Sequence, residues 1–411
     1  MTVVDRSRLE LAKIAVGVAF AANGLALGGW LARAPAIRAD LGLSSAGFGL
    51  LLLCLSGASI AAIPLAGPLV QRFGPARSVL YASMSVVVGL AGLGTGTAAG
   101  SVPFAGAGLV FIGVGVSLWD VAMNVEGADV ERRLGRTLMP RFHAGFSIGT
   151  VAGAGVSAAA ATAAVTVTTQ VYATAAVIAV VMLFTVRRFL PVPELHREES
   201  PGGRVRDAWR EPRTLLIGVL ILGFGFTEGA ANDWLAISLV DGYGATEAVG
   251  AIGFGFFVAA MTLGRIFGHA AIERWGRVVT LRLTAVSALA GLLLVVSGIG
   301  VPVVLAGALL WGAGASLGFP IGMSAAADDP LRAAIRVSVA GSIGYGAFLA
   351  GPPLIGLLAE HVGVLPALLV VVAAIGLGLL GSGAARPLTP ENAPHPLAES
   401  EPHSTEPQGE R

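Results

Sequence analysis

SVLYASMSVVVGLAGLGTGTAAGSVPFAGAGLVFIGVGVSLW, at residues 78–119, is a 42-residue stretch that contains no Asp, Glu, Lys or Arg. A transmembrane helix needs about 20 consecutive apolar residues, so this stretch is long enough for two crossings. Glycine and proline gather near its middle, between Gly94 and Pro103, and such residues mark turns. The stretch therefore predicts two membrane-spanning helices joined by a short turn.

Charge-free runs of similar length recur along the chain. Residues 144–186 (43 residues) and residues 283–327 (45 residues) each predict another hairpin, with turns at residues 166–170 and 298–302. Six shorter apolar stretches each supply one helix: residues 14–32, 41–71, 214–240, 248–271, 337–359 and 362–385, of which 214–240 contains Glu228 and Asp233 and 248–271 contains Arg265. Together these runs predict an all-α membrane protein with twelve transmembrane helices.

The composition agrees with a chain whose solvent is lipid. Only 12% of the 411 residues are charged and the mean hydropathy is +0.80, whereas a soluble domain carries roughly 25% charged residues. The net charge of +1 gives no electrostatic basis for binding nucleic acid, and the single cysteine, Cys54, excludes a disulfide framework and a cysteine-based metal site. We expect the lipid bilayer as a partner, with no cofactor and no nucleic acid.

The basic residues predict the orientation. With the N-terminus inside, 24 of the 26 Arg and Lys residues fall on the cytoplasmic side, and only Arg33 and Arg38 remain outside. Cytoplasmic loops of membrane proteins carry such an excess of Arg and Lys. We expect a multi-pass protein of the bacterial plasma (inner) membrane, with the N- and C-termini both cytoplasmic.

The chain also aligns with itself at an offset near 200 residues. QRFG at residues 71–74 matches ERWG at 273–276, GVGVSL at 113–118 matches GAGASL at 312–317, and SIG at 147–149 recurs at 342–344. This repeat predicts two pseudo-symmetric six-helix bundles with a substrate site near the midplane between them. The predicted boundaries are 1–189 for the N-terminal bundle, 190–213 for a cytoplasmic central loop, 214–385 for the C-terminal bundle and 386–411 for a disordered cytoplasmic tail.

The basic loop GPLVQRFGPAR at residues 67–77 resembles the signature loop of the major facilitator superfamily, and so does its second copy, ERWGR at 273–277. Gln71 stands where the superfamily usually has Asp, so we expect the charge pairing of this loop to be absent or to be carried by Glu273. The resemblance covers nearly the whole chain and implies a transporter fold. We assign the loop residues to gating: Arg72, Arg77, Glu273, Arg274 and Arg277.

A narrower resemblance is carried by WDVAMN at residues 119–124, RFHAGFS at 141–147, and Glu228 with Asp233 and Trp234. These motifs are similar to those of the branch around the MosC and YbjJ proteins. That branch is more distantly similar to sugar–proton symporters of the fucose permease type. Its members mostly lack an assigned substrate, so the branch defines the fold better than the function.

Ionisable groups inside a membrane cost about 2.5–3.5 kcal/mol each and usually face a cavity or one another. Asp120 and Asn124 lie four residues apart and so share a helix face, with His143 at a similar depth. An acid–imidazole pair of Asp120 and His143 would bind and release a proton near neutral pH. The alternative is that these residues and Glu126 form an inner-side packing or gating network with Arg132, Arg133, Arg136 and Arg141.

A second polar set lies in the seventh predicted helix. Glu228 is near the middle of the bilayer by residue count, Asn232 is four residues further on, and Asp233 lies closer to the outside. We expect substrate or proton binding at Glu228, proton coupling at Asp233 and substrate binding at Asn232. Asn23, at matching depth in the first helix, and Asn124 are further substrate-binding candidates; an interhelical hydrogen bond is the alternative for Asn23 and Glu228.

Aromatic and helix-breaking residues complete the candidate site. Trp30, Trp119 and Trp234 are candidates for the cavity wall, with interfacial anchoring as the alternative for Trp30 and Trp234. We expect Arg33 to pair with Asp233 or Asp241 in an outer gate. Pro352 and Pro353 interrupt helical hydrogen bonding and predict a kink, either static or used in gating.

These residues predict a secondary active transporter for a small polar organic solute, sugar- or inositol-like, coupled to protons and working by alternating access as a monomer. The alternative is a proton-driven efflux antiporter for apolar or cationic compounds, which a greasy, mostly aromatic cavity would favour. A membrane sensor or enzyme is the third class, but no catalytic triad, metal motif or soluble output domain is visible. No Gly-Lys-Ser/Thr loop is present for ATP-driven transport.

Overall fold

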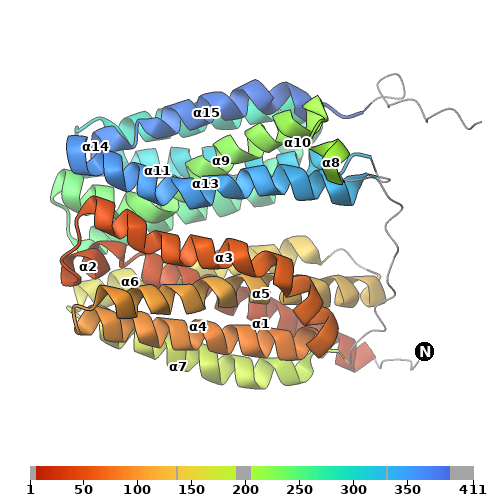
Figure 1. Cartoon of the computed structure of the whole chain (residues 1–411), viewed down its shortest axis with the longest axis horizontal. Helices are drawn as coiled ribbons and strands as arrows, with labels where there is room; N and C mark the ends of the chain where they lie inside the picture. Colours follow the sequence, from red (N-terminus) through yellow and green to blue (C-terminus); the bar gives the residue numbers. More distant parts are fainter. Residues whose placement is uncertain (1–5, 136–137, 191–204, 330–331, 389–411) are drawn as a thin grey trace, which may run out of the picture.

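The computed structural model describes residues 6–135, 138–190, 205–329 and 332–388, and its regular elements there are all helices. Figure 1 shows long helices running side by side from one end of the molecule to the other. The start of α1 (Arg6–Leu31) and the end of α15 (Val370–Gly381) lie at one end, which we call the terminal side. The short helices α2 (Ala34–Asp40) and α14 (Val364–Ala367) lie at the opposite end, the distal side.

The first half of the chain forms one group of helices. α1 packs against α6 (Met139–Thr162), and α5 (Val102–Leu134) packs against α3 (Ser45–Phe73) and α4 (Pro75–Ala98), which in turn contacts α7 (Val167–Thr185). A 3₁₀ turn, η1 (Val186–Arg188), follows α7. Thr166 caps α7 by accepting a hydrogen bond from the Thr169 N–H; the turn predicted at residues 166–170 ends earlier, because α7 already begins at Val167.

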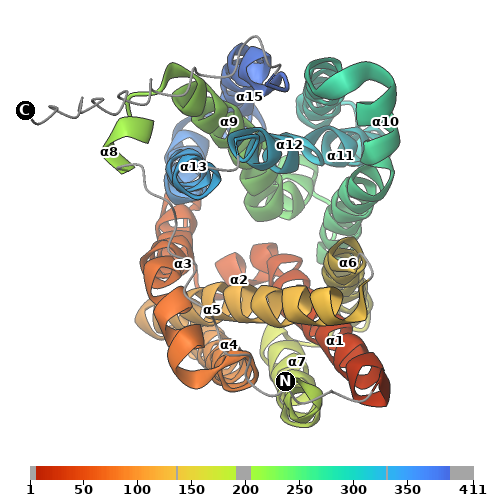
Figure 2. The same ribbon diagram turned by 90° about the vertical axis from the view of Figure 1, so that its right-hand side faces the viewer.

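The second half forms the other group, as Figure 2 shows. Its helices are α9 (Pro212–Ile237), continued by the π-helical turn η2 (Ser238–Gly242), α10 (Glu247–Val296), α11 (Val301–Ala315), α12 (Gly318–Ala326), α13 (Ala333–Val362), α14 and α15. α8 (Val205–Ala208) precedes α9, and η3 (Ser382–Ala385) follows α15. The predicted loop residues 191–204 and tail residues 389–411 lie outside the described residues.

The helix count agrees with the prediction. Eleven helical stretches are long and apolar enough to cross a membrane, and one of them is the 50-residue α10. Gly276 inside α10 has φ 74° and ψ 165°, so the backbone leaves the helix there and α10 makes two crossings. Eleven stretches plus one extra crossing give twelve spans within the described residues, which confirms the expected all-α fold.

Glycines at matching positions confirm the two pseudo-symmetric bundles. Gly74, between α3 and α4, has φ 78° and ψ 160°, almost the same conformation as Gly276. This left-handed region favours glycine because it has no Cβ. A Cβ on Gly113 would lie 2.3 Å from the Leu55 oxygen, and a Cβ on Gly312 would lie 2.1 Å from the Phe257 oxygen. The same close helix contacts therefore recur in both bundles.

Candidate functional site

A cavity of about 380 Å³ lies between the two bundles, within the range of small-molecule sites. Helices α1, α3, α5 and α6 line it from the first bundle, and α9 and α13 from the second. Its polar lining is Asn23, Ser56, Ser59, Ser117, Asp120, Asn232, Asp233 and Tyr345. Its apolar lining is Leu27, Leu31, Leu52, Leu55, Ile60, Ile63, Val116, Val121, Phe146 and Phe348, with Gly229 and Pro352 completing the wall.

Asp120 brings a carboxylate from α5 to this cavity. The Asn124 side-chain amide donates to the Asp120 Oδ1 at 3.2 Å and to the Asp120 backbone oxygen at 2.8 Å, so the two share a helix face as predicted. Tyr345 of α13 lines the cavity from the other bundle and interacts electrostatically with Asp120. Asn124 itself is not a lining residue, so its contribution is to hold the Asp120 carboxylate.

Asp233 and Asn232 bring a second carboxylate and an amide from α9. Both line the cavity and both are half-buried. Neither makes a hydrogen bond or an ion pair with any residue that the structure describes. The second bundle therefore contributes an acid with no basic partner in this part of the chain.

Asn23 of α1 lines the cavity although its side chain is only 1% exposed. Its Nδ2 faces the Met123 Sδ at 3.9 Å, and its Oδ1 has no hydrogen-bond partner. The cavity serines Ser56, Ser59 and Ser117, and Tyr345, were not among the predicted site residues. Serine is common in transmembrane helices, so nothing in the sequence distinguished these from packing residues.

Glu228 is placed differently from the prediction. It does not line the cavity, and its Oε2 forms an ion pair with the Arg265 Nη2 at 2.9 Å. Arg265 also donates from Nε to the Ser316 backbone oxygen at 3.2 Å. Counting Arg265 among the cytoplasmic basic residues was therefore wrong: it lies inside α10, and its charge neutralises Glu228.

His143 does not form the predicted acid–imidazole pair. Its ring packs edge-on against Phe20, with 5.1 Å between centroids, and no hydrogen bond joins it to Asp120 among the described residues. The charged group that interacts electrostatically with the His143 ring is Arg265, which belongs to the other bundle. In the described chain, no group of three or more His, Cys, Asp or Glu side chains is arranged to hold a metal ion.

The tryptophans also differ from the prediction. Trp30, Trp119 and Trp234 are 1%, 0% and 0% exposed, and none lines the cavity. Helix packing buries them, so they neither form the cavity wall nor reach the lipid interface. Trp234 packs edge-on against Phe48, with 6.2 Å between ring centroids, and thus joins the two bundles.

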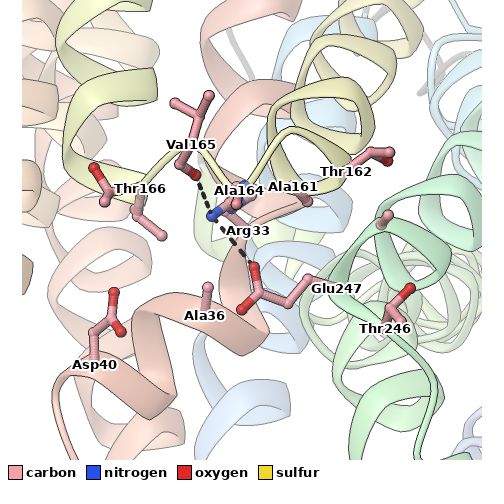
Figure 3. Close-up of a pocket in the computed structure, with 12 residues that line it drawn as sticks. Arg33, Ala36, Asp40, Ala161, Thr162, Ala164, Val165, Thr166, Thr246 and Glu247 are labelled. Carbon is pink, nitrogen blue, oxygen red and sulfur yellow. Dashed lines mark hydrogen bonds and ion pairs between the residues drawn. The ribbon is translucent and has the colours of Figure 1, made fainter.

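Ion pairs connect the bundles on the distal side. Figure 3 shows Arg33 between the Val165 oxygen, 3.1 Å away, and Glu247 of α10, 3.2 Å away. These residues line a second pocket of about 630 Å³. Arg38 pairs with Asp241 of η2 at 2.5 Å. The expected gate partner of Arg33 was thus wrong: Asp241 is bound by Arg38, and Asp233 lies in the central cavity.

α3 and α13 close the same side by direct contact. The Ala46 N–H donates to the Glu360 Oε2 at 3.2 Å. A Cβ on Gly49 would lie 2.5 Å from the Pro352 oxygen, so the two backbones touch. Pro352 and Pro353 both lie inside the continuous helix α13. Asp120 and Tyr345 are exposed and line the cavity behind this contact.

Charges on the terminal side of the second bundle are paired between helices. Asp328 binds Arg213 and Arg277, each at 2.8 Å. Glu211 binds Arg332 and Arg336, each at 2.6 Å, and Arg336 also reaches Asp329 at 3.1 Å. The expectation that Glu273 carries the loop pairing was wrong, because Asp328 does so. Glu273 is exposed and pairs with no described residue.

In the first bundle the terminal-side charges are paired locally or not at all. Asp129 binds Arg132 at 2.5 Å and Arg133 at 2.8 Å on its own helix, and Glu126 accepts from the Leu190 N–H at 2.6 Å. The Glu126 carboxylate makes no hydrogen bond or ion pair with Arg132, Arg133 or Arg141, although Arg133 acts on it electrostatically; Arg136 lies outside the described residues. Arg72 and Arg274 stack on Phe73 and Trp275. Arg77 and Arg141 are exposed and make no ion pair with the described residues.

The chain belongs to the Major Facilitator Superfamily, whose family model matches residues 14–338. It is 33% identical over 349 residues to the uncharacterized transporter y4wD of Sinorhizobium fredii, covering 84% of this chain and 90% of that protein. It is 27% identical over 373 residues to the membrane protein MosC of Rhizobium meliloti, covering 89% and 88%. These relatives confirm the predicted resemblance and define a multi-pass membrane transporter.

Solved structures of transporters share the fold. A mutant form of the nucleoside transporter NupG superposes with a TM-score of 0.75 at 14% identity, covering 91% of this chain and 98% of that chain. The D-xylose–proton symporter superposes with a TM-score of 0.67 at 15% identity, covering 94% and 98%. At sequence identities this low, the structural similarity establishes the architecture but does not identify the solute.

Proposed function

We propose that this chain is a secondary active transporter that moves a small polar organic solute together with protons by alternating access. The observation that carries the proposal is the cavity between the bundles, which Asp120 of one bundle and Asp233 of the other both line without an ion pair to any described residue. In this proposal the terminal side is cytoplasmic, the membrane is the bacterial inner membrane, and the unit is a monomer.

The two carboxylates have separate roles in the proposal. Asp233 has no hydrogen-bond partner among the described residues, and an isolated carboxylate inside a membrane is stabilised by binding a proton or a cation. Asp233 is therefore the proton-coupling residue. Asp120 is exposed in the cavity and oriented by Asn124, which suits direct contact with the solute.

Glu228 loses the coupling role that its mid-bilayer position suggested. The Arg265 guanidinium already neutralises it, and removing one member of such a pair leaves an uncompensated charge, which is costly. We assign the Glu228–Arg265 pair to positioning α9 against α10. Asn23 and Asn232 remain the amides that contact the solute.

Alternating access requires the distal contacts to break when the cavity opens to the other side. Arg33–Glu247 and Arg38–Asp241 join one bundle to the other, so they are the gate residues in this proposal. Pro352 takes part because its oxygen touches Gly49 across the same interface. The fold shared with the D-xylose–proton symporter supports a sugar-sized solute and proton coupling.

The test is uptake by purified protein in proteoliposomes under an imposed pH gradient. The panel contains labelled glucose, myo-inositol, a nucleoside, glucosamine and glucuronate. We expect gradient-driven uptake of at least one solute, its loss in Asp233→Asn and its survival in Asp207→Asn, an exposed carboxylate on α8. Gradient-driven uptake that persists unchanged in Asp233→Asn would remove this residue as the coupling group.

One observation favours the efflux alternative: ten of the twenty cavity-lining residues are Leu, Ile, Val or Phe. Only two of these are phenylalanines, so the wall is apolar without being mostly aromatic. Inverting the pH gradient distinguishes the two functions. A symporter accumulates solute when the outside is acidic, whereas an antiporter expels an apolar or cationic dye under the same gradient.

A further inference from the structure

The hydrogen-bonding inventory of the central cavity points to the charge of the solute. We propose that the solute is a protonated amine with further N–H or O–H donors, and that its ammonium group binds Asp120. This inference rests on the proposed transport function and adds the chemical class of the solute.

The first argument is charge. Among the described residues, the cavity is lined by two carboxylates, Asp120 and Asp233, and by no Arg, Lys or His. The nearby basic groups are engaged elsewhere: Arg265 binds Glu228, and Arg33 binds Glu247 and the Val165 oxygen. His143 lies on Phe20 outside the lining. The missing positive charge must therefore be brought in by protons or by the solute.

The second argument is that the cavity serines have no hydrogen to donate. Ser56 donates its hydroxyl to the Leu52 oxygen at 3.3 Å, and Ser59 donates to the Gly113 oxygen at 3.1 Å. Ser117 donates to the Ser59 backbone oxygen at 3.1 Å. A hydroxyl carries one hydrogen and two acceptor lone pairs. These three side chains thus present only acceptors to a solute.

The third argument is a buried acceptor without a partner. Asn23 is only 1% exposed, its Nδ2 points at the Met123 sulfur, and its Oδ1 accepts nothing. A buried polar atom left without a hydrogen bond costs about 1–3 kcal/mol. A donor on a solute in this cavity would remove that cost. This observation is independent of the acid pair and also calls for a donor.

The cavity offers few donors in return. Asn232 has an amide NH₂ and Tyr345 a hydroxyl, and neither group makes a hydrogen bond in the described chain. Against them stand both carboxylates, the Asn23 oxygen and the serine lone pairs. A neutral polyol would satisfy part of this surface, but an ammonium group supplies both the donors and the charge. An anionic solute would meet two acids and no cation.

The experiment uses three sugars of nearly one size: glucosamine as the cation, glucose as the neutral form and glucuronate as the anion. Binding is measured by the thermal shift of the full-length purified protein and by competition in proteoliposomes. We expect glucosamine to bind at least about tenfold more tightly than glucose, equivalent to about 1.4 kcal/mol, and glucuronate to show no binding. Ethanolamine and putrescine, with ethylene glycol as the neutral match, extend the panel to smaller amines.

Asp120→Asn should abolish the preference for amines, while its melting temperature without ligand reports folding. Asp120→Glu keeps the charge and should retain the preference, and Asp207→Asn is the matched control on α8. Glucose or glucuronate binding as tightly as glucosamine, or no amine of the panel binding, would overturn the inference. Gradient-driven uptake of glucose alone would refute the amine inference and leave the transport proposal standing. Amine binding without any uptake would refute the transport proposal and leave the amine inference standing.

Discussion

The two bundles have the same backbone arrangement but differ in how their charged residues are paired. Asp328 and Asp129 occupy equivalent positions of the repeat, since residues 113–118 align with residues 312–317. Asp328 connects two other helices through Arg213 and Arg277, whereas Asp129 binds Arg132 and Arg133 of its own helix. Arg336 binds Glu211, while its counterpart Arg141 pairs with no described residue.

Inside the molecule the contrast is weaker. The second bundle neutralises Glu228 with Arg265 but leaves Asp233 unpaired among the described residues, and the first exposes Asp120 to the cavity with the Asn124 amide beside it. At the distal gate the first bundle supplies arginines and the second supplies acids. The repeated glycines thus define the fold, and the unequal charges define where the bundles are held together and where they are free to part.

The largest expected effect tests the equivalence of the backbones. Gly113→Ala and Gly312→Ala would each place a Cβ within 2.3 Å of a backbone oxygen on a neighbouring helix. Overpacking of this kind typically costs about 1–3 kcal/mol and sometimes more. We expect both variants to lower the apparent melting temperature in detergent by similar amounts.

Gly57→Ala in the first bundle and Gly376→Ala in the second are the matched controls, because nothing lies within 4 Å of either Cβ position. Alanine is the better helix former by up to about 1 kcal/mol, so these variants should melt at the same temperature or higher. A severe loss for one glycine of the Gly113/Gly312 pair and none for the other would break the structural equivalence.

The next effect tests the terminal-side contrast. Asp328→Asn leaves Arg213 and Arg277 without their carboxylate, and we expect a loss of about 2 kcal/mol because the acid is 12% exposed. Arg141→Gln removes an exposed arginine and should stay within about 0.5 kcal/mol. Thermal unfolding of both variants measures the difference; equal melting temperatures would argue against a more strongly connected second bundle.

The distal gate gives a smaller effect that a charge swap can isolate. Asp241→Arg places two cations together at Arg38 and should favour opening of the distal side; Arg38→Asp with Asp241→Arg restores the pair. In a Cys54→Ser, Ser56→Cys background, labelling by a membrane-impermeant thiol reagent added from the distal side measures opening. We expect about a tenfold faster reaction for the single variant, equivalent to about 1.4 kcal/mol, and recovery in the swap. A swap that labels as fast as Asp241→Arg would exclude this pair as a gate.

The smallest effect is a pH dependence at Glu211. Burial works to raise the pKa of this carboxyl, but hydrogen bonds from Arg336, Thr214 and Arg332 and the charge of Arg336 outweigh it and hold the pKa below its ordinary value of 4.5. The ionised form is therefore favoured in the folded state. Its stabilisation is present above about pH 4.5 and is lost as the pH falls through the lowered folded pKa.

Glu211→Gln should therefore lower the melting temperature at about pH 7 and make the further loss below about pH 4.5 smaller than in the wild type. Glu273→Gln, at an exposed carboxylate without an ion pair to the described residues, is the control. Parallel pH profiles for the wild type and Glu211→Gln would exclude this linkage.

The helix count and the repeat were readable from the sequence, because charge-free length and glycine spacing are local properties. Pairings between helices were not: Arg265 with Glu228, and Asp328 with Arg277, depend on how helices that are apolar all round rotate against one another. For the same reason the burial of Trp119 was missed. Asp120 and Asp233 could be identified as candidates because a carboxylate stands out in an apolar helix whichever way that helix is rotated.

The most direct test of the account is the coupling of solute and proton movement through Asp233. In weakly buffered proteoliposomes without an imposed gradient, solute added outside should make the outer medium more alkaline in the wild type. With Asp233→Asn, solute exchange should continue within about threefold of the wild-type rate while proton movement falls at least about tenfold. Proton movement at the wild-type ratio in Asp233→Asn would contradict the account.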